Sequence, residues 1–320
     1  MNQRRSSALF VPYEIRPSKQ LERRIFLDVL MRAMLHNFSI SSCRYVGNGG
    51  TKFHDFIMFH RMLGLCKLVS VEGDKSLQPR CHYNKPLDYI EIYEGEMNEF
   101  FDAFISKSPH IVWFDSDDCL VPDVSDVILT IGTKLPEDSF FFFTASAEPP
   151  KPIRKANPKQ RMQWYRDNFK NFASDFDSSD FADGKFRFTT SCILNRIVSS
   201  AFNARPNLIF TPLVKLLYKD STWMMSIGGV LTDFERGAAV KSDLDKSMPF
   251  LLHNSNHGFY QIPQFNISEQ ERMLLDRIAT QPKRLRRDRI QANKLGFDKD
   301  FISEYEKLLR YIPRYFESFI

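Results

Sequence analysis

Short apolar runs alternate with amphipathic segments over the first 147 residues of the chain. The apolar runs have the length of buried strands, and the segments between them carry apolar residues at helical spacing. Strands are predicted at Cys43–Val46, Leu68–Val71, Asp88–Tyr93, His110–Phe114 and Ser139–Thr144. Helices are predicted at 18–37, 53–63, 97–105 and 124–135. This alternation predicts an α/β protein with a parallel sheet.

The pattern changes after Ala147. Residues 148–184 are rich in proline and charge, which is typical of an insertion or lid. Two further strands, 208–218 and 222–231, are joined by a connection short enough for a hairpin. Beyond residue 268 the chain is charged and helical, with a predicted capping box at Ser268–Glu271 and a closing helix at Glu304–Tyr315.

The first predicted strand runs into the turn Tyr45-Val46-Gly47-Asn48-Gly49-Gly50, and the second ends in Glu72. Strand, glycine-rich turn, helix and a second strand ending in an acid form the pattern of a nucleoside-binding unit. The glycines allow the backbone to approach a ligand, and the carboxylate accepts hydrogen bonds from ribose hydroxyls. The pattern therefore predicts an adenosyl cofactor. A turn that only reverses the chain and a solvated Glu72 are the alternatives.

A cluster of acids, Asp115-Ser116-Asp117-Asp118, follows the fourth predicted strand. Mutual repulsion raises the pKa of at least one such carboxylate, which suits a general base, and Asp115 and Asp117 are the candidate catalytic residues. Asp115, Asp117 and Asp118 are also candidate ligands of Mg²⁺ or Mn²⁺. The alternative is a solvated acidic cap ahead of Pro122.

Several segments resemble a poorly characterised bacterial group labelled as O-methyltransferases, which looks like the class I enzymes that use S-adenosylmethionine (SAM). They are Arg16-Pro17-Ser18-Lys19-Gln20-Leu21-Glu22-Arg23-Arg24, Tyr45–Gly50, Asp55-Phe56 with His60, Ser70-Val71-Glu72, Asn84-Lys85-Pro86 and Val112-Trp113-Phe114-Asp115. The likeness covers roughly the first 150 residues. Asn48 stands where the group has an aromatic residue, and Ser116 stands where it has a tyrosine.

The resemblance implies a Rossmann-like sheet of seven strands, in which five parallel strands are followed by an antiparallel hairpin. It implies transfer of a methyl group from SAM to an oxygen of an unknown acceptor. The expected cofactor-binding residues are Tyr45, Gly47, Asn48, Gly49, Gly50, Asp55, Glu72, Asn84 and Asp115. Glu72 is expected to bind both ribose hydroxyls, and Asn84 or the turn near Glu94 and Gly95 is expected to flank the adenine.

Five regions are expected from these patterns. They are an N-terminal helical lead at 1–40, a SAM-binding half at 41–147, an insertion or lid with the substrate region at 148–207, a hairpin at 208–235 that completes the sheet, and a helical extension at 236–320.

Two other functions remain open. The segment Ile111–Asp123 is similar to the metal-binding segment of inverting family-two glycosyltransferases, although the glycines after the first strand do not fit that class. A non-catalytic module that binds SAM or a nucleotide, with a protein partner in a system such as bacterial defence, would use the same glycines and Glu72.

The net charge of +5 permits an anionic partner without requiring one. Basic residues gather at Lys151–Lys170 and Lys283–Arg289, and with Trp164 and Tyr165 these stretches allow nucleic-acid binding, although solvated helix faces explain them equally well. The five scattered cysteines favour neither disulfides nor zinc and fit the cytoplasm. No apolar run is long enough to span a membrane, so no membrane partner is expected.

Overall fold

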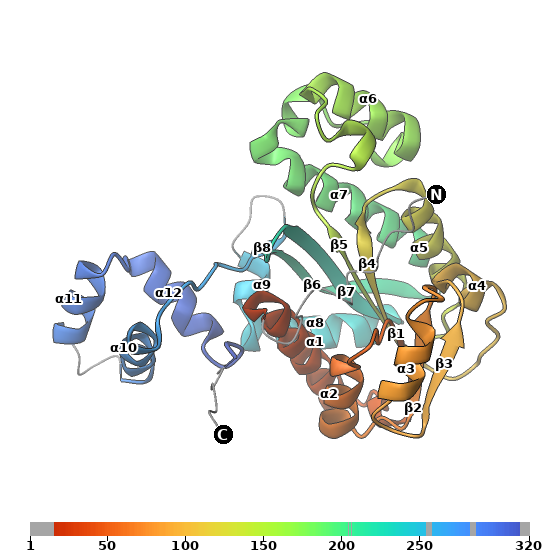
Figure 1. Cartoon of the computed structure of the whole chain (residues 1–320), viewed down its shortest axis with the longest axis horizontal. Coiled ribbons are helices and arrows are strands. Elements are labelled where there is room, and N and C mark those ends of the chain that lie inside the picture. The colour runs from red at the N-terminus through yellow and green to blue at the C-terminus, as the bar shows by residue number, and fades with distance from the viewer. Residues whose placement is uncertain (1–15, 204, 206, 254–257, 282–285, 314–320) are drawn as a thin grey trace.

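A central sheet of eight strands organises the described part of the chain, in the order β3-β2-β1-β4-β5-β7-β6-β8 (Figure 1). The computed structural model describes residues 16–203, 205, 207–253, 258–281 and 286–313. The strands are β1 Arg44–Gly47, β2 Lys67–Glu72, β3 Ile90–Glu94, β4 His110–Cys119, β5 Ser139–Ser146, β6 Ile209–Lys219, β7 Trp223–Thr232 and β8 Tyr260–Gln261. Strands β1 to β5 are parallel, and β7 lies antiparallel between β5 and β6. The predicted sheet of five parallel strands and a hairpin is confirmed, and β8 adds a short eighth strand beside β6.

Helices cover both faces of this sheet. The helices are α1 Pro17–Leu35, α2 His54–Leu63, α3 Gln78–Asn84, α4 Met97–Asp102, α5 Pro122–Lys134, α6 Pro158–Phe169, α7 Asp183–Phe202, α8 Phe234–Ser247, α9 Phe250–His253, α10 Glu269–Thr280, α11 Arg286–Lys294 and α12 Lys299–Leu308. Short 3₁₀ turns lie at η3 Ile40–Ser42, η4 Lys151–Ile153, η5 Lys170–Phe172 and η6 Ser178–Phe181. Helices α1, α2 and α8 contribute to the core on one face, and α4, α5 and α7 contribute to the core on the other.

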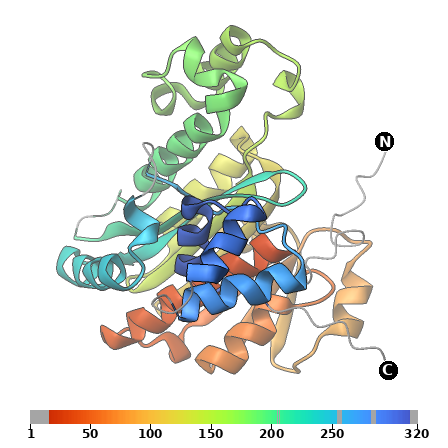
Figure 2. The same cartoon turned by 90° about the vertical axis from the view of Figure 1, so that its left-hand side faces the viewer.

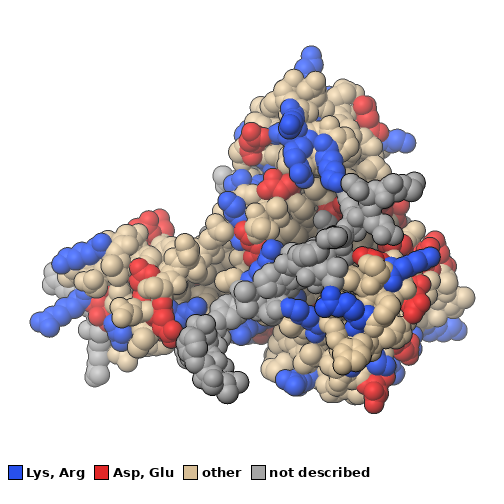
Figure 3. All heavy atoms as spheres, in the orientation of Figure 1, with Lys and Arg blue, Asp and Glu red and all other residues tan. Residues whose placement is uncertain are grey.

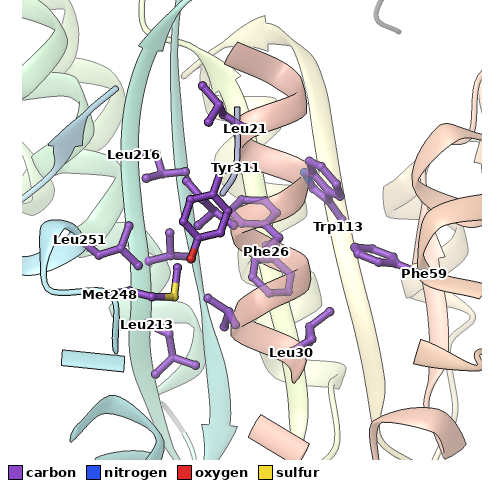
Figure 4. Packing of buried hydrophobic residues seen from close by; sticks show 14 of the residues in the cluster. Leu21, Phe26, Leu30, Phe59, Trp113, Leu213, Leu216, Met248, Leu251 and Tyr311 are labelled. Atoms are coloured by element: carbon purple, nitrogen blue, oxygen red, sulfur yellow. The ribbon is translucent and has the colours of Figure 1, made fainter. Parts of the chain in front are cut away.

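Strand β5 shows why the sheet needs both layers. Phe140 and Phe142 belong to the first core, whereas Phe141 and Phe143 belong to the second. On the first face the Phe142 ring stacks on Phe26 of α1 at 4.4 Å between centroids. Figure 4 shows Phe26, Trp113 and Tyr311 converging in that core. A continuous apolar run is what a strand buried on both faces requires, as predicted from the sequence.

Several predicted boundaries differ from the structure, and three of them are informative. Strand β4 does not end near Asp115, because its pairing with β5 resumes at Cys119 and Ser146 after an irregularity. Helix α1 ends at Leu35, because Asn37 has a positive φ of 62° that an α-helix does not accommodate. The closing helix α12 begins at Lys299 and ends at Leu308. Tyr315, the predicted end of that helix, lies outside the described residues.

Residues 148–182, here called the lid, project beyond the ends of β4 and β5 (Figures 1 and 2). They contain η4, α6, η5 and η6 and hold an aromatic cluster of their own around the buried Tyr165. The Tyr165 ring stacks on Phe169 at 5.3 Å and lies 5.8 Å from Phe186 of α7. Helix α7 then leads from the lid back to the sheet, where it packs along α5.

Helices α10, α11 and α12 lie to one side of the sheet (Figure 1). The predicted capping box is present at the start of α10, where Ser268 and Glu271 exchange hydrogen bonds with each other's backbone. Tyr260 of β8 donates to Glu304 of α12 and so joins this group to the sheet. Residues 283–285 of the basic stretch Lys283–Arg289 lie outside the described residues. Among the described helices, none combines the length and the apolarity that crossing a membrane requires.

Candidate functional site

The glycine-rich turn lies at the carboxyl end of β1, between the ends of β2 and β4. Asn48 spans these neighbours, because its Nδ2 donates to the carbonyl oxygen of Val71 at 3.4 Å and its Oδ1 accepts from the backbone N–H of Asp115 at 3.3 Å. The Gly49 N–H donates to the hydroxyl of Ser70 on β2 at 3.1 Å. The turn is therefore held to both adjacent strands at the edge where open α/β sheets bind ligands.

The glycines of this turn are explained first by the protein's own packing. A Cβ at Gly47 would lie 2.5 Å from the Tyr45 hydroxyl, and one at Gly49 would lie 2.6 Å from the Phe53 ring. Gly50 has a positive φ of 53°, a conformation that costs glycine little. The turn therefore requires glycine even without a ligand, in addition to the ligand approach predicted from the sequence.

Tyr45 and Asp55 lie beneath the turn. Both side chains are buried, and the Tyr45 hydroxyl donates to Asp55 at the start of α2. Burial raises the pKa of Asp55, although the charge of Arg23 and the Tyr45 hydroxyl oppose the shift. This position makes the two residues a support for the turn rather than part of its exposed surface.

Glu72 lies at the end of β2, next to β1. One oxygen of its carboxylate accepts from the Asp74 N–H at 2.9 Å, and the other lies 3.7 Å from the Cys81 sulfur. Partial burial raises the pKa of Glu72, the Asp74 N–H opposes this, and the nearby Asp74 and Glu96 charges raise it further. A carboxylate with few donors around it retains acceptor capacity for a ligand.

Helix α3 closes this part of the site from the side. The Cys81 thiol donates to the Gly50 carbonyl oxygen at 3.1 Å, and Asn84 Nδ2 donates to the Thr51 carbonyl oxygen at 3.0 Å. Asn84 is exposed at the end of the helix. The structure thus places Asn84 beside the glycine-rich turn. Its role next to the adenine stays a prediction.

Asp115 lies on the other side of the turn and pairs with a lysine that the sequence did not single out. Its Oδ2 is 2.7 Å from Nζ of Lys19 in the first turn of α1, and the Asp115 side chain is 31% exposed. Burial alone lowers the pKa of Lys19, but the carboxylates of Asp115 and Glu22 outweigh burial and raise it. One face of the Asp115 carboxylate is therefore fixed by a buried cation.

A network of hydroxyl groups holds Glu22, the second partner of Lys19. Glu22 Oε2 lies 2.7 Å from Lys19 Nζ and accepts from the Tyr218 hydroxyl at 3.1 Å. Its other oxygen accepts from Thr144 at 2.8 Å and from Ser226. The network joins α1 to β5, β6 and β7, so that the first turn of α1 is fixed against the sheet beside Asp115.

Sequence reasoning missed Lys19 and Glu22, although both lie in a segment of the family resemblance. A signal was present, because the two residues extend the apolar stripe of α1 that continues through Ile25 and Val29. Charged residues on the buried face of an amphipathic helix need partners.

The remaining acids of the predicted metal site are not gathered in the described structure. Asp118 is exposed, and the Asp117 side chain lies outside what the structure describes. Within the described residues, no three acids, histidines or cysteines form a group able to hold a metal ion. In the described structure, the cation that pairs with Asp115 is the ammonium group of Lys19.

The two aromatics of the basic stretch Lys151–Lys170 differ in exposure. Tyr165 is fully buried, so its ring is not accessible to a base. Trp164 is half-buried and packs edge-on against Tyr165 at 5.0 Å.

Comparison with known proteins gives a family for the whole chain. A family model described as "Putative O-methyltransferase" matches residues 11–320. No curated protein matches the sequence. Solved structures with a similar arrangement include the O-methyltransferase from Bacillus cereus in complex with SAH, at 10% identity and a TM-score of 0.39 over 70% of this chain and 85% of that one. Another is the Methanococcus jannaschii fibrillarin pre-rRNA processing protein, at 9% identity and a TM-score of 0.37 over 61% of this chain and 69% of that one.

Proposed function

Because the chain belongs to the "Putative O-methyltransferase" family, we propose that it binds SAM on the Gly47–Gly50 turn and transfers the methyl group to an oxygen of an acceptor. The predicted methyltransferase-type enzyme is confirmed at the level of the family. One observation carries the proposal for the cofactor. The turn and the Glu72 carboxylate lie at the carboxyl ends of β1 and β2, and Asp115 lies beside the turn on β4, where its N–H donates to Asn48. The three strands are adjacent in the sheet.

The donors and acceptors around the turn fit the parts of SAM. Glu72 offers a half-buried carboxylate for the ribose hydroxyls, which are hydrogen-bond donors. Glu96 lies close by, since a Cβ on Gly73 would come within 2.2 Å of its carboxylate. Two neighbouring carboxylates favour a ligand that donates hydrogen bonds or carries positive charge, and SAM does both.

Asp115 is the proposed general base. The sulfonium of bound SAM supplies an electrophilic methyl group. Lys19 pairs with one oxygen of the Asp115 carboxylate. The exposed part of the Asp115 side chain then accepts a hydrogen bond from the hydroxyl group of the substrate that is methylated. As the methyl group bonds to the acceptor oxygen, Asp115 takes the hydroxyl proton. Lys19 and Glu22 are positioning residues in this scheme, because they act through Asp115.

The two alternative functions make different demands on these residues. A glycosyltransferase of the family-two type would use the acids after Asp115 for a metal ion, and the family match offers that function no support. A non-catalytic module would need the turn and Glu72 but not the Asp115 carboxylate.

Calorimetry with S-adenosylhomocysteine (SAH) tests the cofactor directly. The wild-type protein is expected to bind SAH, and Glu72→Gln is expected to weaken binding by about thirtyfold, since a hydrogen bond to a charged group is worth about 2 kcal/mol. Glu91→Gln on β3 is the control, because Glu91 is exposed and carries the same charge. Binding of UDP-sugar with Mn²⁺ and not of SAH would overturn the proposal.

Asp115→Asn separates an enzyme from a binding module. This variant is expected to keep SAH binding and to lose transfer of labelled methyl from SAM to acceptors in a cell extract. Equal transfer by the variant and the wild type would exclude Asp115 as the base.

A further inference from the structure

Three cationic side chains of the lid line a surface cavity, and no acidic residue is part of its lining. The cavity has a volume of about 780 Å³ and is lined by Lys151, Arg154, Lys155 and Gln160 together with Pro152, Ile153 and Ala156. Figure 3 shows Lys and Arg atoms gathered on the projecting lid. A concave surface with cations and no carboxylate attracts a compact anion.

The other charged residues of the lid do not neutralise these cations. Asp183 pairs with Arg161, Asp175 with Arg196 and Asp180 with Lys185. Among the described residues, no ion pair joins an acid to Lys151, Arg154 or Lys155. Of the other acids in the lid, Glu148 accepts from the Trp223 N–H, Asp167 from Gln163 and Asp177 from the Ser179 N–H. None of these acids lines the cavity, so the cavity keeps its positive charge.

The backbone that carries the three cations is anchored. Ile153 between them is buried in the second core, and Pro150 and Pro152 restrict the chain on either side of Lys151. The buried Arg161 donates to the Arg154 carbonyl oxygen at 3.3 Å and to the Phe181 carbonyl oxygen at 3.3 Å. A site with a fixed backbone loses less entropy on binding than a mobile one.

The cavity also lies near the strand that carries Asp115. Burial raises the pKa of the Cys119 thiol at the end of β4; the Arg154 guanidinium opposes that shift, and the Asp118 and Glu148 carboxylates add to it. Cys119 follows Asp115 by four residues on the same strand, with an irregularity between them. Strand β4 therefore leads from Asp115 toward Arg154.

We propose that Lys151, Arg154 and Lys155 bind a phosphate group of a small phosphorylated acceptor while its hydroxyl is methylated beside Asp115. This inference rests on the proposed function for the identity of the ligand as acceptor, but the phosphate site itself is independent of SAM. Lysine and arginine are the side chains that proteins use for phosphate, through charge-assisted hydrogen bonds. A small molecule fits better than a nucleic-acid strand, because the buried Tyr165 and Phe169 stack on each other inside the lid and are not accessible to bases.

Titration with inorganic pyrophosphate, a probe without base or sugar, tests the site. The wild-type protein is expected to bind it, and the triple variant Lys151→Gln, Arg154→Gln, Lys155→Gln is expected to bind about tenfold or more weakly, because three charge-assisted contacts are lost. The control triple variant is Lys107→Gln, Lys134→Gln, Lys294→Gln, which removes the same charge at exposed positions outside the cavity. The control is expected to bind as the wild type does.

A second titration uses a 12-nucleotide single-stranded RNA. Binding of the RNA in the absence of pyrophosphate binding would overturn the small-molecule proposal, and so would equal loss of pyrophosphate binding in both triple variants. SAH binding by the lid variant is expected to be unchanged. If SAH fails to bind even the wild type while pyrophosphate binding still depends on the lid, the proposed function fails and the phosphate site stands.

Discussion

Lys19 is 3% exposed and stays charged only because two carboxylates lie within 2.7 Å of its ammonium group. Such a pair adds little net stability compared with apolar residues of the same size, but the loss of one partner leaves a buried charge. The network is therefore better explained by the position it gives Asp115 than by stability. Thr144 and Ser226 donate to the Glu22 oxygen that Lys19 does not contact, and Tyr218 donates to the oxygen that Lys19 does contact.

Replacing Glu22 by Gln is expected to lower the free energy of unfolding by about 3 kcal/mol, because Lys19 loses one of its two buried counter-charges. Urea denaturation measures this change. Adding Lys19→Met is expected to cost less than the sum of the single changes, since the unpaired charge is gone. Lys241→Met breaks a half-exposed pair with Asp245 and is expected to cost less than about 1 kcal/mol. Full additivity of the two buried changes would contradict this account.

His110 makes the stability of the folded protein depend on pH. Burial lowers its pKa from 6.5 to about 4, and its Nδ1 lies 2.6 Å from the Ser108 carbonyl oxygen. The unfolded chain binds a proton below pH 6.5 that the folded chain refuses, so stability falls as the pH drops from about 6.5 to about 4. The loss from this group is at most about 3 kcal/mol.

His110→Phe is expected to remove that part of the pH dependence. Urea unfolding at pH 7.5 and pH 5 measures it, because the difference between the two values shrinks in the variant. A difference equal to that of the wild type would show that other groups cause the acid sensitivity.

At the scale of elements, helices α5 and α7 approach closely enough that a glycine is required between them. A Cβ on Gly132 of α5 would lie 2.6 Å from the carbonyl oxygen of Ala201 on α7, which is a backbone atom and cannot rotate away. Both helices contribute to the second core on the same face of the sheet. Helix propensity favours alanine at this position, and packing opposes it.

Gly132→Ala is expected to destabilise the protein by about 2 kcal/mol, because overpacking outweighs the gain of about 1 kcal/mol in helix propensity. Gly184→Ala is the matched control in the first turn of α7, where a new Cβ meets nothing within 4 Å. The control is expected to be neutral or slightly stabilising. Thermal unfolding of the two variants compares them, and an equal response at both positions would count against the packing argument.

The elements themselves followed from local patterns in the sequence. Phe140–Phe143 and the other apolar runs of the sheet predicted the parallel strands, because burial on both faces leaves a continuous apolar signal. The two-residue strand β8 has no such signal. The turn at Gly47–Gly50 was also predictable, but the partner of Asp115 was not, since Lys19 is 96 residues away in the sequence and only the folded sheet brings the two together.

At the scale of the whole molecule, the C-terminal segment is part of the central core. Tyr311 is buried in the same core as Phe26 and Trp113, and its hydroxyl donates to Asp28 of α1 at 2.6 Å (Figure 4). Arg24 of α1 donates to the carbonyl oxygens of Tyr311 and Ile312 at 3.3 and 3.2 Å. The two ends of the described chain therefore stabilise each other.

Tyr311→Ala is expected to cost about 3 to 5 kcal/mol, as for other large aromatic residues removed from a core. Tyr311→Phe keeps the ring but removes the hydroxyl that donates to Asp28 and accepts from Arg310, and it is expected to cost about 1 kcal/mol. Tyr83, which is 90% exposed, provides the control, and Tyr83→Ala is expected to leave stability unchanged. Denaturant unfolding measures all three, and a small effect of Tyr311→Ala would show that the C-terminal segment folds apart from the sheet.

The Glu22 network also bears on the order in which the protein is made. Helix α1 is synthesised first, yet the partners of Glu22 include Ser226, which lies 204 residues later. A ribosome that has released the glycine-rich turn and all five parallel strands has not yet released the hairpin that fixes Glu22. The partly synthesised chain thus contains all five parallel strands, but the network that holds Lys19 beside Asp115 is incomplete. Contacts between residues so far apart in the sequence slow folding. The proposed role of Asp115 therefore requires that β7 has docked.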